Sequence, residues 1–146
     1  MPALLILYNT KTGNTELMAK AVEEGAKAVK GVEVILTYHA RPEELQNADT
    51  IIIGAPTYNH NITLDIQNLL EETAQINVSL EGKTATAFGS YGWSGEAPKQ
   101  VLEILKNRFQ MKTIEPPILV NYRPDEKTLQ QCRELGKKVA QALTKA

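Results

Sequence analysis

The strongest constraint on the fold is a regular alternation between short apolar runs and segments of helical period. Apolar runs bounded by turn residues predict strands at residues 4–8, 32–37, 50–54, 83–89 and 118–120. Apolar residues three and four positions apart predict helices around residues 17–29, 41–45, 62–70, 101–109 and 129–143. Strands alternating with helices predict an α/β fold with a parallel sheet covered by helices on both faces. The uninterrupted apolar strands fit a sheet that is buried on both sides.

Length and composition narrow the class of protein. A chain of 146 residues predicts one domain, spanning residues 1–146. The formal net charge of -1 gives no reason to expect nucleic acid or an anionic membrane as a partner. Cys132 is the one cysteine, so neither an intrachain disulfide nor a cysteine metal cluster is expected. The apolar start is too short for a signal peptide, and no run approaches the length of a membrane span, so we expect a cytoplasmic protein without a metal.

The loop after the first strand is rich in hydroxyl and amide groups. In open parallel sheets, ligands bind beyond the carboxyl ends of the strands, where this loop lies. A phosphate at a helix N-terminus meets free backbone N–H groups and the positive end of the helix dipole. Gly13 lets the backbone fold closely around an anion, and side-chain donors stand at Thr10, Thr12, Asn14 and Thr15. The loop is neither G-x-G-x-x-G nor a P-loop. The simpler alternative is plain helix capping by Asn14 or Thr12.

Two further loops, residues 54–61 and 88–96, follow the third and fourth strands and carry aromatic side chains. They hold Tyr58, Tyr91 and Trp93, the last of which is the one tryptophan of the chain. Aromatic residues on loops at one end of a sheet indicate stacking on a planar ligand. The alternative for Trp93 is that it only covers the end of the sheet.

The segments T-K-T-G-N-T at residues 10–15 and S-Y-G-W-S-G at residues 90–95 resemble known sequences. The first resembles the phosphate loop of the flavodoxins. The second is similar to short-chain flavodoxins and, more closely, to the flavodoxin domain of flavodiiron proteins. The resemblance extends from Leu4 to the last helix, without a long insertion in the fifth strand. It implies a flavodoxin-like three-layer sandwich, with a five-stranded parallel sheet in the order 2-1-3-4-5, and noncovalently bound FMN.

The resemblance also implies roles for individual residues. The first loop would wrap the FMN phosphate, with Lys11 at a variable, solvent-facing position. Tyr58 and Trp93 would lie on opposite faces of the isoalloxazine ring, and the backbone near Tyr91 would bind its pyrimidine edge. The predicted cofactor-binding residues are Thr10, Lys11, Thr12, Gly13, Asn14, Thr15, Pro56, Thr57, Tyr58, Asn59, His60, Asn61, Ser90, Tyr91, Gly92, Trp93 and Gly95. Gly95 and Glu96 are expected to open the next helix.

The loop after the third strand departs from the family pattern. Asn59 stands where many short-chain flavodoxins have glycine, whose peptide flips on reduction and stabilises the neutral semiquinone. Asn61 stands where relatives often have an acidic side chain near the flavin. Asparagine adopts positive φ less freely than glycine, and an amide accepts hydrogen bonds more weakly than a carboxylate. His60 is either a titrating group near the flavin or, the interpretation we favour, an exposed histidine without a role.

These features predict a monomeric electron carrier that shuttles electrons between an unidentified reductase and an unidentified acceptor protein. An enzyme with its own substrate is the first alternative, as an FMN-dependent NAD(P)H or quinone reductase. The short loops favour the carrier, because such reductases build a pocket over the flavin. A second alternative is a flavodoxin module that serves a separate diiron oxidoreductase.

Overall fold

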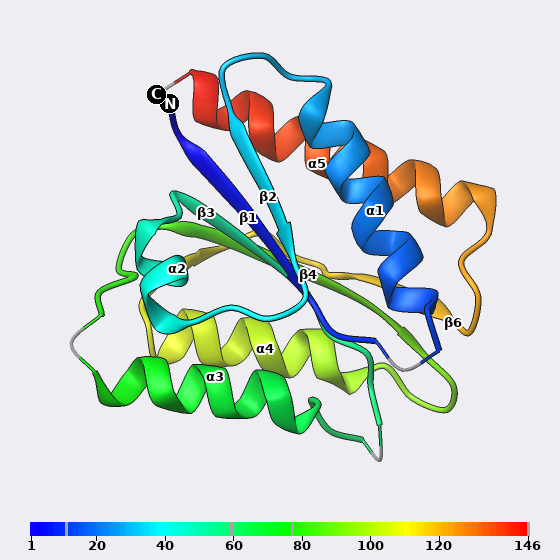
Figure 1. Cartoon of the computed structure of the whole chain (residues 1–146). Helices are drawn as coiled ribbons and strands as arrows, with labels where there is room; N and C mark the ends of the chain where they lie inside the picture. The colour runs from blue at the N-terminus through cyan, green and yellow to red at the C-terminus, as the bar shows by residue number, and fades with distance from the viewer. Residues whose placement is uncertain (11, 59, 77, 146) are drawn as a thin grey trace.

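The computed structural model describes residues 1–10, 12–58, 60–76 and 78–145. The strands are β1 (Ala3–Tyr8), β2 (Glu33–Thr37), β3 (Thr50–Gly54), β4 (Thr84–Tyr91), β5 (Lys112–Thr113) and β6 (Ile118–Asn121). The helices are α1 (Asn14–Lys27), α2 (Pro42–Asn47), α3 (Leu64–Gln75), α4 (Glu96–Asn107) and α5 (Glu126–Thr144). They form three layers: α1 and α5 cover one face of the sheet, and α2, α3 and α4 cover the other (Figure 1).

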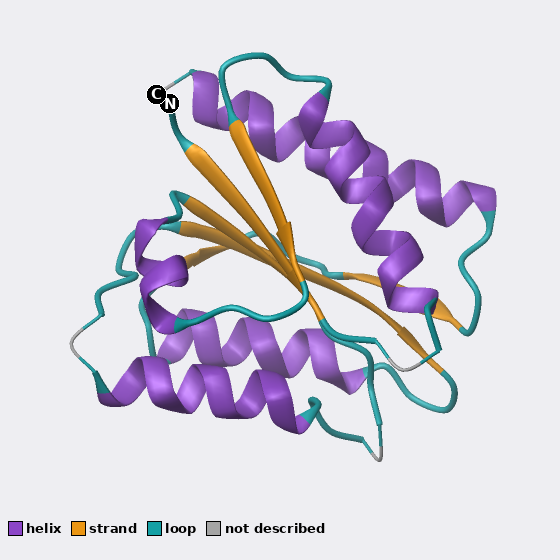
Figure 2. Ribbon diagram, viewed as in Figure 1, coloured by secondary structure: helices purple, strands orange, loops and turns teal. Residues whose placement is uncertain are grey.

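All strand pairs of the sheet are parallel, and their order confirms the predicted fold. The order is β2-β1-β3-β4, and both β5 and β6 pair with β4 at the fifth position. Lys112 of β5 lies opposite Thr84, whereas Ile118 of β6 lies opposite Phe88. The fifth strand is therefore interrupted, and only its second segment was predicted from sequence. Figure 2 shows the twisted sheet between the two helical layers.

Alternating side chains of the central strands build a separate core on each face of the sheet. Leu5 and Ile51 belong to the core shared with α2, α3 and α4, whereas Leu4 and Ile52 belong to the core shared with α1 and α5. Burial on both faces explains why these strands are apolar without interruption. Cys132 of α5 is fully buried in the second core, as expected for a small apolar residue.

Several element boundaries differ from the predicted ones by a few residues. Helix α3 begins at Leu64, and Ile62 precedes it although it packs in the same core. Strand β4 continues to Tyr91, two residues beyond Gly89, because it pairs with β6 as far as Asn121. This longer strand carries Ser90 and Tyr91 to the rim where a ligand would bind. None of the described helices has the length and apolarity that crossing a membrane requires.

Candidate functional site

A cleft of about 430 Å³ opens at the carboxyl ends of the central strands. It is lined by Thr12, Asn14, Thr15, Pro56, Thr57, Tyr58, Ser90, Tyr91, Gly92, Trp93 and Tyr122. The structure thus brings together all three loops that the sequence singled out. Every lining residue except Tyr122 was predicted.

The loop after β1 ends in a helix start that is built without a side-chain cap. Gly13 is the N-cap residue of α1 and has a φ of 88°, a left-handed conformation that glycine adopts without steric cost. The Gly13 N–H donates to the hydroxyl oxygen of Thr10 at 2.9 Å. Capping by Asn14 or Thr12 is therefore not what this loop does. Both side chains line the cleft instead, beside the first turn of α1, whose N–H groups have no intrahelical acceptor.

Thr15 connects the first loop to the end of β4. Its side chain is 1% exposed, and its hydroxyl oxygen accepts a hydrogen bond from the Ser90 N–H at 3.3 Å. A hydroxyl group that accepts one bond still has its own proton to donate. Thr15 can therefore hold the two loops together and donate to a ligand in the cleft.

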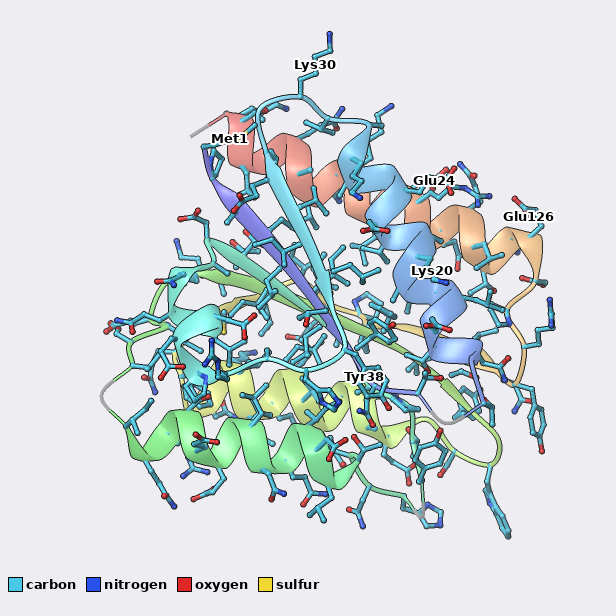
Figure 3. All side chains as sticks on the ribbon, viewed as in Figure 1. Met1, Lys20, Glu24, Lys30, Tyr38 and Glu126 are labelled. Carbon is cyan, nitrogen blue, oxygen red and sulfur yellow. The ribbon has the colours of Figure 1, made fainter. Side chains whose placement is uncertain are left out.

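Two tyrosines outside the cleft hold the first loop and the start of α1, a role that the sequence did not reveal. Tyr38, at the carboxyl end of β2 (Figure 3), donates from its hydroxyl group to the Thr10 carbonyl oxygen at 3.1 Å. Tyr8 donates to the Glu16 carboxylate at 3.0 Å, and the two tyrosine rings meet edge to face at 5.4 Å. Burial and the bond to Glu16 raise the pKa of Tyr8 above its usual value. The tyrosine therefore remains a neutral donor.

The aromatic side of the cleft combines Tyr58, Trp93 and Tyr122. Trp93 is 90% exposed, so it does not cover the end of the sheet as the alternative interpretation held. Tyr122 is 64% exposed and directly follows β6, and its carbonyl oxygen accepts a bond from the Ser90 hydroxyl group. The signal for Tyr122 was available in the sequence, because it is an aromatic residue placed after a strand at the same edge of the sheet.

The loop after β3 makes a tight turn at its tip. The backbone groups of Tyr58 and Asn61 exchange two hydrogen bonds, at 3.1 Å and 2.9 Å. Asn61 lines a separate groove between α3 and α4, so the structure does not bring it to the cleft. Behind the turn, the Thr57 hydroxyl oxygen accepts a bond from the Ala97 N–H at 3.0 Å, which ties this loop to the first turn of α4.

The other predicted residues that the structure describes lie next to the cleft or beside the first loop. His60 lines an adjoining cavity of about 230 Å³ together with Thr57, Trp93 and Ser94. Gly95 is the N-cap residue of α4, which begins at Glu96 as predicted. Thr10 and Gly13 shape the first loop without lining the cleft. Lys11 and Asn59 lie outside the described residues.

Comparisons with known proteins agree with this geometry. The chain is 36% identical to the putative diflavin flavoprotein A 6 of Nostoc sp., over 97% of this chain and 25% of that protein. It is 33% identical to a flavodoxin of Clostridium beijerinckii, over 92% of this chain and 97% of that protein. The solved structure of a flavodoxin from the domain Archaea superimposes with a TM-score of 0.85 at 32% identity, covering 97% of this chain and 99% of that one.

The relatives differ in how much of their own length is matched. The chain spans about a quarter of the diflavin flavoprotein and about a third of the type A flavoprotein fprA of Rhodobacter capsulatus. It spans nearly all of the Clostridium flavodoxin. The model of the flavodoxin family matches residues 6–136, which is most of the chain. This chain therefore belongs to the flavodoxin family.

Proposed function

We propose that this chain is an FMN-binding electron carrier. The observation that supports it is a single cleft with two unlike ends. One end has the N-terminus of α1 with polar side chains that suit a phosphate, and the other has aromatic side chains that suit a flat ring system. A phosphate joined to a planar ring is the ligand that uses both ends at once.

The residues present fit FMN. Thr12, Asn14 and Thr15, with the first-turn N–H groups of α1, would hold the phosphate. Tyr58 and Trp93 would lie along the ring and exclude water from it. When bound, the flavin supplies one-electron chemistry, while the protein binds it, orients it and adjusts its potential.

The absorption spectrum of the purified protein, followed by titration of the apoprotein with FMN and with riboflavin, tests this function. We expect flavin absorption bands in the purified protein and tighter binding of FMN than of riboflavin, because only FMN has a phosphate for the α1 end of the cleft. Equal affinities for the two ligands would argue against the phosphate site. An apoprotein that takes up neither ligand would overturn the proposal.

The reductase alternative makes a different prediction for the same holoprotein. A carrier receives electrons from a partner protein, so NAD(P)H alone should reduce the bound flavin slowly. Rapid bleaching of the flavin by NAD(P)H without a reductase would favour an enzyme. Size-exclusion chromatography at micromolar protein concentration tests the accompanying proposal that the carrier is a monomer.

The long relatives favour a second candidate for the partner. Because this chain matches only one part of longer flavoproteins, among them the flavodiiron core of Synechocystis sp. PCC6803, it is proposed to act as the same kind of module for a separate diiron oxidoreductase. The test is to mix the reduced chain with a flavodiiron protein whose own flavodoxin domain has been removed and to follow flavin reoxidation. A rate no higher than that in buffer would contradict this candidate and leave the carrier function intact.

A further inference from the structure

His60 connects two loops that lie at the aromatic end of the cleft. Its Nδ1 atom lies 2.8 Å from Glu96 Oε2, and the Ser94 hydroxyl oxygen lies 2.9 Å from the same nitrogen. The His60 and Trp93 rings are 6.3 Å apart, at an interplanar angle of 65°. His60 belongs to the loop after β3, whereas its three partners belong to the segment after β4. The His60 side chain is thus exposed to solvent, yet it contacts three residues of the other segment.

The backbone of His60 is held from the same side as its ring. The Gln100 side chain of α4 donates to the His60 carbonyl oxygen at 3.1 Å. His60 has a φ of 64°, a conformation that residues with a side chain adopt at a cost unless their surroundings hold them there. Contacts to both the ring and the main chain of His60 supply that support.

These contacts set the position of the two aromatic residues that face the cleft. Tyr58 comes two residues before His60, and Trp93 comes directly before Ser94. Deeper in the molecule, the Thr57–Ala97 hydrogen bond already joins the two segments. The contact of His60 with Glu96 and Ser94 joins them a second time, at the exposed end. Loss of this outer contact would free the tip of the Tyr58 loop while leaving its base attached.

The contact depends on charge. Nδ1 donates to Glu96 only when it carries a proton, and an imidazolium ring adds a full positive charge to that bond. Hydrogen bonds from Ser94 and from His60 lower the pKa of Glu96, so this carboxylate stays ionised below its usual range. Among the described residues that contact His60, Glu96 is the ionisable one, since Ser94, Trp93 and Gln100 do not titrate. Imidazole groups change charge between about pH 5 and 8.

We propose that His60 is a positioning residue for the flavin: paired with Glu96 in its imidazolium form, it holds the Tyr58 loop against the Trp93 loop and raises the affinity for FMN. This inference rests on the proposed FMN function. It makes FMN affinity depend on the charge of a side chain that does not itself line the cleft. Glu96 serves as the fixed anionic partner, because it belongs to the first turn of α4.

The first experiment measures the FMN dissociation constant of wild type and variants at pH 6 and pH 8.5. His60→Asn removes the titrating ring but keeps a residue that tolerates positive φ, and Glu96→Gln removes the charge but keeps the shape. We expect each variant to bind FMN about threefold more weakly than wild type at pH 6, the size of an exposed ion pair. At pH 8.5 the ratio of variant to wild type should be smaller than at pH 6, because the neutral ring can keep the Nδ1–H bond to Glu96 but not its positive charge. Taking this ratio cancels the titration of the FMN phosphate, which all the proteins share.

Two further variants sharpen the result. The double variant should bind no more weakly than either single variant, because both remove the same contact. His39→Asn is the matched control, since His39 is the other histidine of the chain and contacts the Tyr38 ring instead. It should bind FMN as wild type does at both pH values. Ratios for the His60 and Glu96 variants that are equal at the two pH values would overturn the inference.

The second experiment needs no flavin. Trp93 is the sole tryptophan, so the fluorescence of the apoprotein reports on the surroundings of His60. We expect a pH-dependent change in emission between pH 5 and 8 that His60→Asn abolishes and His39→Asn preserves. In Glu96→Gln the change should be smaller than in wild type, because the ring loses its anionic partner. A change as large in Glu96→Gln as in wild type would overturn the ion pair.

Failure of the FMN function and failure of the His60 positioning role give different results. A wild-type apoprotein that does not bind FMN overturns the proposed function, and the fluorescence titration then still decides whether the His60–Glu96 pair exists. FMN binding that is insensitive to the His60 and Glu96 variants overturns only the positioning role.

Discussion

The hydroxyl oxygen of Thr15 accepts a hydrogen bond from the backbone N–H of Ser90, which lies 75 residues later in the chain. Thr15 belongs to the first turn of α1, and Ser90 is the second-to-last residue of β4. Both residues are at least nine-tenths buried. The bond therefore joins the donor-rich part of the cleft to the aromatic part, and it does so out of contact with water.

Replacing Thr15 by valine tests this connection. Thr15→Val keeps the shape of the side chain but leaves the Ser90 N–H without its acceptor. We expect the free energy of unfolding to fall by about 1–3 kcal/mol, the cost of an unsatisfied buried group. Urea denaturation of the apoprotein measures the change. Thr15→Ser retains the hydroxyl group and is the matched control, which should bind FMN better than Thr15→Val does. A valine variant as stable as wild type would contradict the prediction.

Trp93 should matter for binding and not for folding. Its side chain is 90% exposed, so Trp93→Ala should change the free energy of unfolding by no more than about 0.5 kcal/mol. Loss of ring stacking should weaken FMN binding by about 1 kcal/mol, or about fivefold in the dissociation constant. Trp93→Phe should recover most of that affinity. Fluorescence titration with FMN measures the affinity of both variants, and urea denaturation measures their stability. An alanine variant with unchanged affinity would remove Trp93 from the proposed site.

Gly136 should resist substitution although it lies inside a helix. A Cβ atom at Gly136 would lie 2.0 Å from the Val22 carbonyl oxygen, and one at Gly25 would lie 1.8 Å from the Arg133 carbonyl oxygen. Alanine is the better helix former by about 1 kcal/mol, but forcing α1 and α5 apart costs about 1–3 kcal/mol or more. We therefore expect Gly136→Ala to lower stability in thermal unfolding.

The control for this substitution is Gln141→Ala, at an exposed position of the same helix. It should change stability by no more than about 0.5 kcal/mol. If Gly136→Ala proved as stable as the control, the close helix contact would not exist in solution.

Stability should fall at alkaline pH because of Cys132. Burial raises the pKa of its thiol to about 12. An unfolded thiol ionises near pH 8.5, so above that value the unfolded state loses a proton that the folded state keeps. The contribution of Cys132 to stability is thus complete below about pH 8.5 and declines from there towards pH 12. Urea denaturation between pH 7 and 10.5 should show this decline, and Cys132→Ala should lack that part of it.

The same residue offers a kinetic check. Cys132 is the one cysteine and is fully buried. A thiol reagent should therefore modify the folded protein no faster than local unfolding exposes the thiol. Rapid stoichiometric labelling of the native protein at pH 8 would show that the thiol is accessible and would contradict the pKa argument.

The near-neutral charge should raise the potential of the second one-electron step of the bound flavin. Negative charge around a flavin disfavours its anionic reduced form, and here the net charge is only -1. We expect a potential less negative than in strongly acidic flavodoxins. Arg123→Glu, next to Tyr122 at the cleft, should lower it, and the difference should shrink at high salt. Potentiometric titration of wild type and variant at low and high salt measures these potentials. A wild-type value as low as in acidic relatives would contradict the prediction.

Local sequence was enough to predict much of this protein. Runs such as Thr50–Gly54 are apolar at every position because β3 is buried on both faces, so the strand could be identified without knowing its neighbours. The donor-rich loop around Gly13 could be identified in the same way, because a strand, a glycine and a helix start follow one another directly in the chain.

The tyrosines in and around the site were predicted less completely. Tyr38 was missed because its partner is far away in sequence, whereas Tyr122 was overlooked although it is an aromatic residue that follows a strand at the same edge of the sheet. Tyr38 donates to Thr10, 28 residues before it, and Tyr122 reaches the cleft because β6 pairs with β4. Asn61 was expected at the flavin, but the hydrogen-bonded turn with Tyr58 places it in the groove beside α3.

The sequence by itself determined the alternation of strands and helices, the parallel sheet and the three loops that form the cleft, because these follow from the periodicity of side chains along the chain. Only the tertiary structure decided how the loops are joined: Thr15 to Ser90, Thr57 to Ala97, and His60 to Glu96. The physical reason is that each of these bonds needs two groups brought together by the packing of separate elements, and no local pattern specifies such a meeting.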